Sequence, residues 1–253
     1  MEKKKPHSHG ILSSDWSECL SPSGPFDFIA FNFPQLEPVL NEIFRSYTGN
    51  RISLGEAGLR IKKILPEPVT TDMMDAYLDQ AFAVYRGVPE LIEWCLSHGI
   101  LFMINTTAMI GYFQRVFAKG LLPRVPVLSA NPLIRFAASG TDPGDVRELN
   151  ETRDKGKNTA AVVQHFAIPG GRIVVMGDSG GDGPHFEWAE RAGAFIIGSM
   201  TKHSLSSYCR DRDIPIRLRF GISYGEGEGR DVEKEKRFDF MDLVEPLQAI
   251  LKR

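Results

Sequence analysis

The segment most informative about the fold is Arg172-Ile-Val-Val-Met-Gly-Asp178-Ser-Gly-Gly-Asp182. It begins as a run of apolar residues and then changes to two aspartates spaced by glycines. A short apolar run bounded by turn residues is typical of a strand buried on both faces. Glycines at its end allow the backbone to turn and to pass close to another group. We therefore expect a buried strand that delivers Asp178 and Asp182 to one edge of a sheet.

The same pattern recurs along the chain. Further apolar runs cover residues 10–14, 100–105, 125–129 and 194–198. Residues at helical spacing fill the stretches between them, at 88–98, 110–118, 159–166 and 186–192. Alternation of strand and helix predicts an α/β fold, with a doubly wound, Rossmann-like parallel sheet and helices on both of its faces.

One interval is too long for this alternation of single strands and single helices. About 85 residues separate the first two runs, whereas one crossover helix needs far fewer. Ser53-Leu-Gly-Glu56 is a capping-box pattern for a helix that ends before Pro66, and residues 71–85 form another amphipathic stretch. We therefore expect an α/β core of residues 1–19 and 87–200 and a helical cap of residues 20–86. We expect residues 201–253 to form a C-terminal extension that packs on the core, with a strand within 214–224, a last helix at 239–251 and no visible chemistry.

Composition narrows the range of partners. The chain has 30 Lys and Arg against 32 Asp and Glu, a formal net charge of −2, so it lacks the basic surface that nucleic-acid binding needs. No apolar run approaches the roughly 20 residues that span a membrane, so no membrane partner is expected. The three cysteines lie far apart, which favours a reducing compartment and predicts a cytoplasmic protein. The oligomeric state is left open.

Reactive side chains follow the predicted strands. They are Asp15 after the first strand, Thr106 and Thr107 after the second, Asp178 and Asp182 after the fourth, and Lys155 and Lys157 at the helix that leads into the fourth. Parallel strands present their carboxyl ends at one edge, so these groups converge. A carboxylate that attacks phosphorus needs a divalent cation and donors for the phosphoryl oxygens, and oxygen ligands suit Mg²⁺. The set therefore predicts a phosphoryl-transfer site.

Four segments together resemble the haloacid-dehalogenase-like (HAD) hydrolase superfamily, in its phosphoserine-phosphatase-like branch with a helical cap. The family pattern is a strand ending Asp-x-Asp-x-Thr, a strand ending in Ser or Thr, a lysine opening a helix, and a strand ending Gly-Asp-x-x-x-Asp. The corresponding segments are Asp15-Trp-Ser-Glu-Cys19, Phe102-Met-Ile-Asn-Thr106, Lys155 or Lys157, and Gly177-Asp178-Ser-Gly-Gly-Asp182. The resemblance covers about residues 10 to 200, and its fourth motif is the most specific.

The resemblance implies a role for each matching residue. Asp15 would be the nucleophile that forms an aspartyl-phosphate, with Thr106 and Lys155 as catalytic groups that bind the phosphoryl group. Lys155 is preferred to Lys157 because apolar residues 162, 163 and 166 then share its helical face. The remaining implied assignments are substrate binding by Ser17, Thr107 and Lys157, and Mg²⁺ binding by Asp15, Asp178, Asp182 and the Ser17 carbonyl oxygen. The substrate would be a small phosphorylated metabolite.

The first motif departs from the family pattern. Ser17 stands where the second aspartate acts as general acid, and Glu18 and Cys19 replace the usual Gly and Thr. A serine hydroxyl does not supply that proton near neutral pH, and Glu18 or His185 are candidate replacements. The sequence therefore predicts a phosphohydrolase, with a catalytically impaired phosphate-binding or regulatory protein as the alternative.

A second motif overlaps the fourth. Residues 177–181 also fit G-x-S-x-G, the nucleophile elbow of α/β-hydrolases, with Ser179 as nucleophile. That fold needs an acid and then a histidine after further strands. Only His185 and His203 follow Ser179, so the elbow comes too late in the chain. We therefore expect no hydrolase triad at Ser179.

Overall fold

A computed structural model describes residues 8–49 and 51–251 of the chain. The first seven residues of the predicted core, Asn50 of the predicted cap and the last two residues of the predicted extension lie outside this part. No helix among the described residues is long and apolar enough to cross a membrane.

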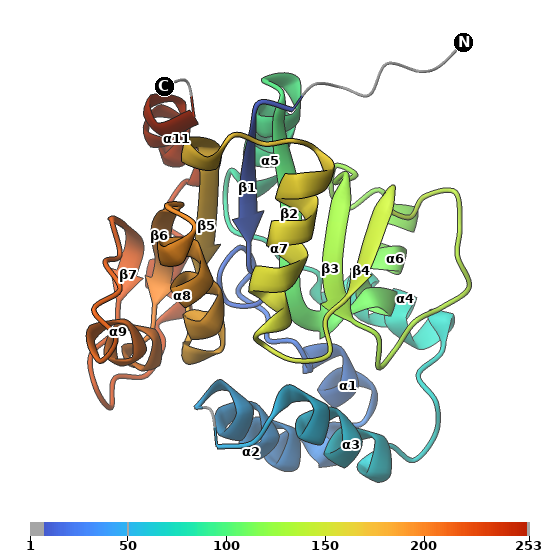
Figure 1. Cartoon of the computed structure of the whole chain (residues 1–253). Helices are drawn as coiled ribbons and strands as arrows, with labels where there is room; N and C mark the ends of the chain where they lie inside the picture. The colour runs from blue at the N-terminus through green and yellow to red at the C-terminus, as the bar shows by residue number, and fades with distance from the viewer. Residues whose placement is uncertain (1–7, 50, 252–253) are drawn as a thin grey trace.

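A seven-stranded, entirely parallel sheet forms the centre of the molecule, in the order β4-β3-β2-β1-β5-β6-β7 (Figure 1). The strands are β1 (Gly10–Ser14), β2 (Ile100–Met109), β3 (Val127–Asn131), β4 (Asp145–Glu148), β5 (Ile173–Gly177), β6 (Phe195–Thr201) and β7 (Leu218–Ser223). The predicted strands are present. Strand β4 was not predicted because three of its four residues, Asp-Val-Arg-Glu, are charged and the strand lies partly exposed at the sheet edge, where no apolar pattern is required.

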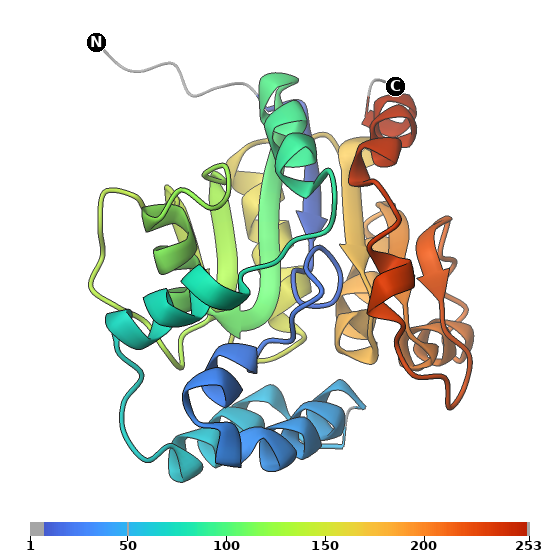
Figure 2. The same ribbon diagram turned by 180° about the vertical axis from the view of Figure 1, so that it is seen from behind.

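Helices cover both faces of the sheet, as the doubly wound prediction requires. α5 (Val88–Ser97), α6 (Ile110–Ala118) and α11 (Val244–Leu251) lie on one face, and α7 (Asp154–His165) and α8 (Gly183–Arg191) on the other (Figures 1 and 2). Successive strand residues point to opposite faces. Leu12 accordingly belongs to the core beneath the first group of helices, whereas Ile11 belongs to the core beneath the second.

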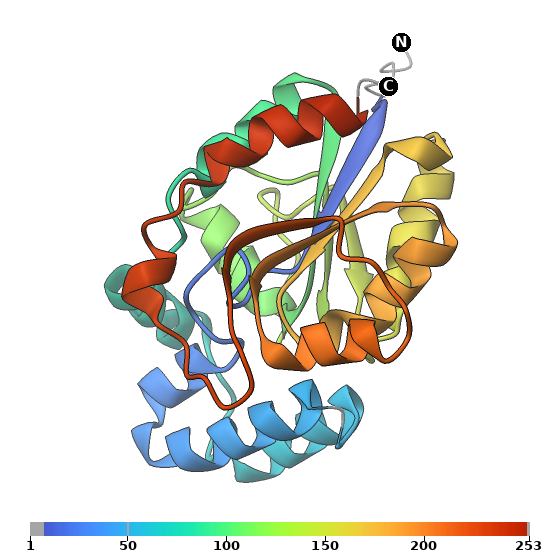
Figure 3. The ribbon, with the colours of Figure 1, turned by 90° about the vertical axis from the view of Figure 1, so that its left-hand side faces the viewer.

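The long insertion after β1 is helical. α1 (Asp27–Asn32), α2 (Glu37–Thr48) and α3 (Leu54–Ile64) lie across the carboxyl ends of the strands (Figures 1 and 3). The Ser53 hydroxyl accepts the Glu56 N–H at 3.1 Å, which caps α3 as the sequence predicts. The fourth helix, α4 (Thr71–Ala81), lies beside α6, where Asp75 binds Arg115 at 2.7 Å. The insertion thus covers the sheet edge where the reactive residues gather.

The segment after β6 is built around a buried carboxylate. It contains α9 (His203–Arg210), β7, α10 (Val232–Glu235) and α11. Glu235 is fully buried and accepts hydrogen bonds from Tyr224, Arg230 and Tyr85, the last of which lies between α4 and α5. These contacts pack the extension on the core and bring Arg230 close to the reactive edge.

Candidate active site

Asp15 directly follows β1 and is held at the sheet edge by its backbone. Its N–H donates to the Met176 carbonyl oxygen of β5 at 3.0 Å, which continues the pairing of the two strands. In the side chain, Oδ1 accepts the Trp16 N–H at 2.7 Å, and Oδ2 lies 3.1 Å from Lys155 Nζ. Burial is the main cause that raises the pKa of Asp15, and the nearby Asp182 carboxylate raises it further, whereas Lys155 lowers it. The carboxylate is therefore buried against one ammonium group.

Lys155 is the lysine that reaches this site. It lies in the first turn of α7, is 1% exposed, and places Nζ 2.5 Å from Asp182 Oδ1 as well as 3.1 Å from Asp15. Asn105 of β2 fixes the start of this helix, because its amide donates to the Lys155 carbonyl oxygen at 3.0 Å. Lys157 is largely exposed and pairs with Asp154 on the surface. The helical-face argument for Lys155 over Lys157 agrees with this placement.

Both carboxylate oxygens of Asp182 accept hydrogen bonds from neighbouring residues. Its Oδ2 accepts the N–H groups of Asp178 and Ser179 at 2.9 and 3.2 Å, and its Oδ1 accepts from Lys155. The side chain folds back over Gly177 so closely that a Cβ there would lie 2.5 Å from Asp182 Cγ. Glycine at 177 is therefore required by this close approach. We assign Asp182 to the positioning of Asp178 and Lys155.

Asp178 carries the site's incompletely satisfied carboxylate. The residue is 1% exposed; its Oδ2 lies 2.8 Å from Lys202 Nζ, and its Oδ1 is buried without a hydrogen-bond partner among the described residues. Burial raises the pKa of Asp178 well above its ordinary value, against the opposing effect of Lys202. A buried, unpartnered carboxylate oxygen is stabilised by a bound cation.

This arrangement fits a divalent metal. One carboxylate oxygen each from Asp15, Asp178 and Asp182 can be chosen so that all three lie within 4.8 Å of one another. The unpartnered Oδ1 of Asp178 is the first candidate ligand for Mg²⁺. The oxygens of Asp15 and Asp182 already bind neighbouring N–H or ammonium groups, and Ser17 lines the same cavity. Mg²⁺ commonly uses one or two carboxylates and completes its shell with water and phosphate oxygens.

Thr107, rather than Thr106, lines the cavity between these groups. The Thr106 hydroxyl is turned onto its own backbone, where it accepts the Ala108 N–H at 3.2 Å. The Thr107 hydroxyl instead lies 3.0 Å from the Tyr47 hydroxyl of cap helix α2. The pairing of β2 with β3 shifts register between Asn105 and Met109. The sequence analysis placed Thr106 at the phosphoryl group by its position in the motif, and this irregularity at the end of β2 is a feature that the motif does not show.

The residues that replace the family pattern in the first motif also reach the cavity. Ser17 and Glu18 both line it. Glu18 has φ 61°, a left-handed conformation that costs a non-glycine residue roughly 1–2 kcal/mol and explains why glycine is usual in this turn. Its carboxylate binds Lys202 and, at 2.5 Å, Arg230. Burial would raise the pKa of Glu18, but these two cations together hold it below its ordinary value.

Lys202 and Arg230 were missed by the sequence analysis, which expected no chemistry after residue 200. Both side chains contact Glu18, and Lys202 also contacts Asp178, so the extension contributes two cations to the candidate site. Lys202 follows β6 directly, so its place at the carboxyl end of a strand was the available signal. Arg230 lies in a loop far along the chain, and no local pattern points to it.

The candidate histidine and the alternative serine nucleophile have other roles. His185 is fully buried and does not line the cavity; its Nε2 lies 3.0 Å from Thr159 Oγ1. The Ser179 hydroxyl caps the short helix of residues 180–182 by accepting a backbone N–H. His185 therefore does not contact Ser179, and the nucleophile-elbow alternative finds no triad there.

The cap is closed over the site. The cavity lined by Asp15, Thr107, Lys155 and Asp178 has a volume of about 10 Å³, enough for about one water molecule. Tyr47 and Phe44 of α2 form part of its wall. Gly180 of the core lies against the end of the same helix, where an added Cβ would lie 2.6 Å from the Thr48 carbonyl oxygen. A phosphate ester therefore needs the cap to open before it can enter.

Solved structures share this architecture. A substrate-bound phosphoserine phosphatase complex matches with a TM-score of 0.66 at 16% identity, over 97% of this chain and 99% of that one. A phospho-aspartyl intermediate analogue of phosphoserine phosphatase matches with a TM-score of 0.65 at 14% identity, over 94% and 99%. A HAD family hydrolase from Salmonella enterica serovar Typhi matches with a TM-score of 0.60 at 14% identity, over 84% and 68%.

The chain therefore has the α/β fold of the haloacid-dehalogenase-like hydrolases. Within that class, its fold is phosphoserine-phosphatase-like. Neither the known family models nor the curated proteins give a match to this sequence. The fold thus agrees with the resemblance that the four sequence motifs indicate.

Proposed function

We propose that this protein is a Mg²⁺-dependent phosphohydrolase that acts on a small phosphorylated metabolite through an aspartyl-phosphate on Asp15. The observation that carries the proposal is the contact of Asp15 with Lys155, beside Asp178 and beneath a closed cap. A buried carboxylate with cations around it is suited to attack a phosphoryl group, because the charges of nucleophile and phosphate are both compensated.

The chain's own residues supply the nucleophile and the hydrogen-bond donors for the transfer. A carboxylate oxygen of Asp15 forms a bond to phosphorus while the bond from phosphorus to the leaving oxygen breaks. Lys155 and Thr107 are placed to donate hydrogen bonds to phosphoryl oxygens, and cap closure excludes bulk water during the transfer. Water then attacks the phosphorus of the aspartyl-phosphate and releases inorganic phosphate. Mg²⁺, held by Asp178 and Asp15, would neutralise the phosphoryl charge.

The site lacks an evident proton donor for the leaving group. Ser17 has no acidic group, and Lys202 and Arg230 keep Glu18 ionised. The enzyme is therefore suited to esters whose leaving oxygen departs without full protonation. We expect p-nitrophenyl phosphate to be cleaved faster than a simple alkyl phosphate.

The test is phosphate release from p-nitrophenyl phosphate, with and without Mg²⁺, by the wild type, Asp15→Asn and the exposed control Asp211→Asn. We expect Mg²⁺-dependent turnover that falls at least about a hundredfold in Asp15→Asn and is unchanged in the control. Borohydride reduction during turnover should convert the phosphorylated Asp15 to homoserine, detectable by peptide mass. Turnover that survives in Asp15→Asn would contradict the proposed nucleophile.

A second function uses the same site without turnover. Ser17 in place of an acid and Lys202 against Asp178 favour a phosphate-binding or regulatory protein that has lost efficient hydrolysis. This alternative predicts that Mg²⁺ and inorganic phosphate bind with no phosphate release from any ester. Titration calorimetry with both ions, beside the turnover assay, separates the two functions.

A further inference from the structure

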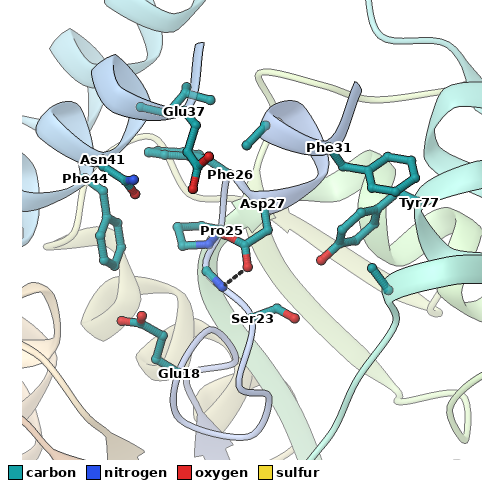
Figure 4. A pocket seen from close by; sticks show the side chains of 14 residues that line it. Glu18, Ser23, Pro25, Phe26, Asp27, Phe31, Glu37, Asn41, Phe44 and Tyr77 are labelled. Atoms are coloured by element: carbon teal, nitrogen blue, oxygen red, sulfur yellow. Dashed lines mark hydrogen bonds between the residues drawn. The ribbon is translucent and has the colours of Figure 1, made fainter. Parts of the chain in front are cut away.

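A second, larger cavity adjoins the candidate active site. It has a volume of about 510 Å³ and lies between the segment of residues 23–31, α2 and α4 (Figure 4). Glu18 and Phe44 line both this cavity and the small one around Asp15. A ligand with its phosphate against Lys155 would therefore extend past these two side chains into the larger cavity once the cap has opened.

All charged side chains that line this larger cavity are acidic. Three of its 14 lining residues are carboxylates, Glu18, Asp27 and Glu37, and none is lysine, arginine or histidine. Glu18 is compensated by Lys202 and Arg230, but neither Asp27 nor Glu37 has an ion pair with a described residue. Both lie at the first position of a helix and are exposed to solvent. Two carboxylates without an ion-pair partner among the described residues thus line the part of this cavity that is formed by α1 and α2.

The surroundings of Asp27 agree with a missing cation. Its Oδ2 accepts the Gly24 N–H at 2.7 Å, which fixes the carboxylate on the cavity wall. Burial is the main cause that raises the pKa of Asp27, and the Glu18 and Glu37 carboxylates raise it further, whereas the Gly24 N–H and Arg230 lower it. A bound cation between Asp27 and Glu37 would relieve this repulsion.

Aromatic rings form the rest of the wall. Figure 4 shows Phe31 and Tyr77 on one side of Asp27 and Phe44 on the other. Phe31 and Tyr77 pack edge to face, with ring centroids 5.6 Å apart, and Phe31 is 36% exposed although it is a large apolar residue. Aromatic rings beside carboxylates attract organic cations, because the ring faces carry negative electrostatic potential.

We propose that this cavity binds a cationic nitrogen on the alcohol part of the substrate, so that the substrate class is phosphorylated amino alcohols without a carboxylate. This proposal rests on the proposed phosphohydrolase function. The phosphate meets Lys155 at one end, and the nitrogen meets Asp27, Glu37 and the rings at the other. A carboxylate on the ligand would meet only like charges in this cavity, which excludes phospho-amino acids as preferred ligands.

Phosphorylated amino alcohols would also suit a site that has no proton donor for the leaving group. A positively charged nitrogen near the ester oxygen withdraws electron density and stabilises the alkoxide that leaves. Such an ester needs less help from a general acid than an uncharged alkyl ester does. The charged cavity and the replacement of the acid by Ser17 therefore favour the same kind of substrate.

The test compares two ligands of nearly equal shape. Phosphocholine carries a quaternary nitrogen, and 3,3-dimethylbutyl phosphate has a carbon atom in its place. Titration calorimetry on the full-length Asp15→Asn chain should give at least about tenfold tighter binding of phosphocholine, a difference of about 1.4 kcal/mol. O-phosphoserine should bind at least about tenfold more weakly than phosphocholine. Equal or tighter binding of either comparison ligand would overturn the proposal, as would failure of all three to bind.

Variants locate the effect in the cavity. Glu37→Gln, at an exposed position where folding is not at risk, should reduce the preference for phosphocholine about threefold, and Phe31→Leu should also reduce it. Glu42→Gln, an exposed substitution on the same helix outside the cavity, should keep the wild-type preference. An unchanged preference in both Glu37→Gln and Phe31→Leu would contradict the assignment of the cavity.

Turnover separates this inference from the function on which it rests. Equal hydrolysis and equal affinity of the two matched esters would overturn the cationic class and leave the phosphohydrolase intact. Preferential binding of phosphocholine without hydrolysis of any ester would support the cavity and overturn the proposed reaction.

Discussion

Lys202 Nζ lies 2.8 Å from Asp178 Oδ2, and the Lys202 backbone N–H donates to the Asp178 carbonyl oxygen at 2.8 Å. The lysine is thus attached twice to the residue proposed to bind Mg²⁺. Its ammonium group also contacts Glu18, and it lies 5.5 Å from the centre of the Phe44 ring. An ammonium so close to a metal-binding carboxylate competes electrostatically with the metal.

Removing this ammonium should strengthen metal binding. We expect Lys202→Met to bind Mg²⁺ about tenfold more tightly than the wild type, because a positive charge beside Asp178 has been deleted. Titration calorimetry with Mg²⁺ or Mn²⁺ measures the affinity directly and needs no turnover. Lys157→Met, which deletes an exposed lysine, should leave the affinity unchanged. Weaker metal binding in Lys202→Met would mean that the lysine helps to build the metal site.

A carboxylate at position 17 should restore a proton donor. Ser17 is buried on the wall of the cavity around Asp15, so an added carboxyl group there would lie close to a bound phosphate ester. We expect Ser17→Asp to raise kcat for an alkyl phosphate about tenfold or more, with a smaller gain for p-nitrophenyl phosphate, whose leaving group needs no proton. Ser17→Asn is the matched control. An equal gain for both esters would argue against general-acid chemistry as the cause.

The two candidate lysines should differ sharply in their effect on folding. Lys155→Met leaves the buried carboxylates of Asp15 and Asp182 without their shared cation, so we expect a loss of about 3 kcal/mol in the free energy of unfolding. Lys157→Met removes a largely exposed pair and should change it by no more than about 0.5 kcal/mol. Urea unfolding at pH 7 measures both values. Similar losses in the two variants would refute the assignment.

His185 should make the protein sensitive to mild acid. Burial lowers the pKa of His185 from 6.5 to about 3, and its Nδ1 is buried without a partner among the described residues. Below pH 6.5 the unfolded chain gains a proton that the folded chain does not accept, so stability falls with pH in this range. Linkage gives a loss of about 2 kcal/mol between pH 7 and pH 5 from this residue.

The measurement for His185 is the difference between wild type and His185→Asn. Urea unfolding of both proteins at pH 7 and pH 5 cancels the contributions of other titrating groups. The wild type should lose about 2 kcal/mol more than the variant between the two pH values. An equal loss in both proteins would show that His185 is protonated in the folded state as well.

The positions of some site residues can be predicted from the sequence, because they depend only on single strands and turns. Asp15 and Asp178 stand directly after buried apolar runs, and Lys155 opens the helix whose apolar face the sequence shows, so their convergence could be predicted. The choice between Thr106 and Thr107 could not, because it depends on a register shift at the end of β2 that no alternation pattern reveals.

Other parts of the site depend on tertiary structure alone. Arg230 reaches Glu18 only because Glu235, Tyr85 and Tyr224 form a buried hydrogen-bond network that places its loop. The cavity with Asp27 and Glu37 arises where the first two cap helices meet, and each carboxylate alone has the ordinary pattern of a helix start. In the sheet, β4 was missed because a half-exposed edge strand needs no apolar residues on both faces.

The ion pair between Glu18 and Arg230 joins residues 212 positions apart in the chain. Synthesis proceeds from the N-terminus at about 5–20 residues per second, so about 10 to 40 s pass on the ribosome between the two residues. During that time Glu18 has no Arg230 with which to pair. A growing chain that already contains Asp15, Lys155 and Asp178 therefore still lacks one of the two cations that bind Glu18 beside the candidate site.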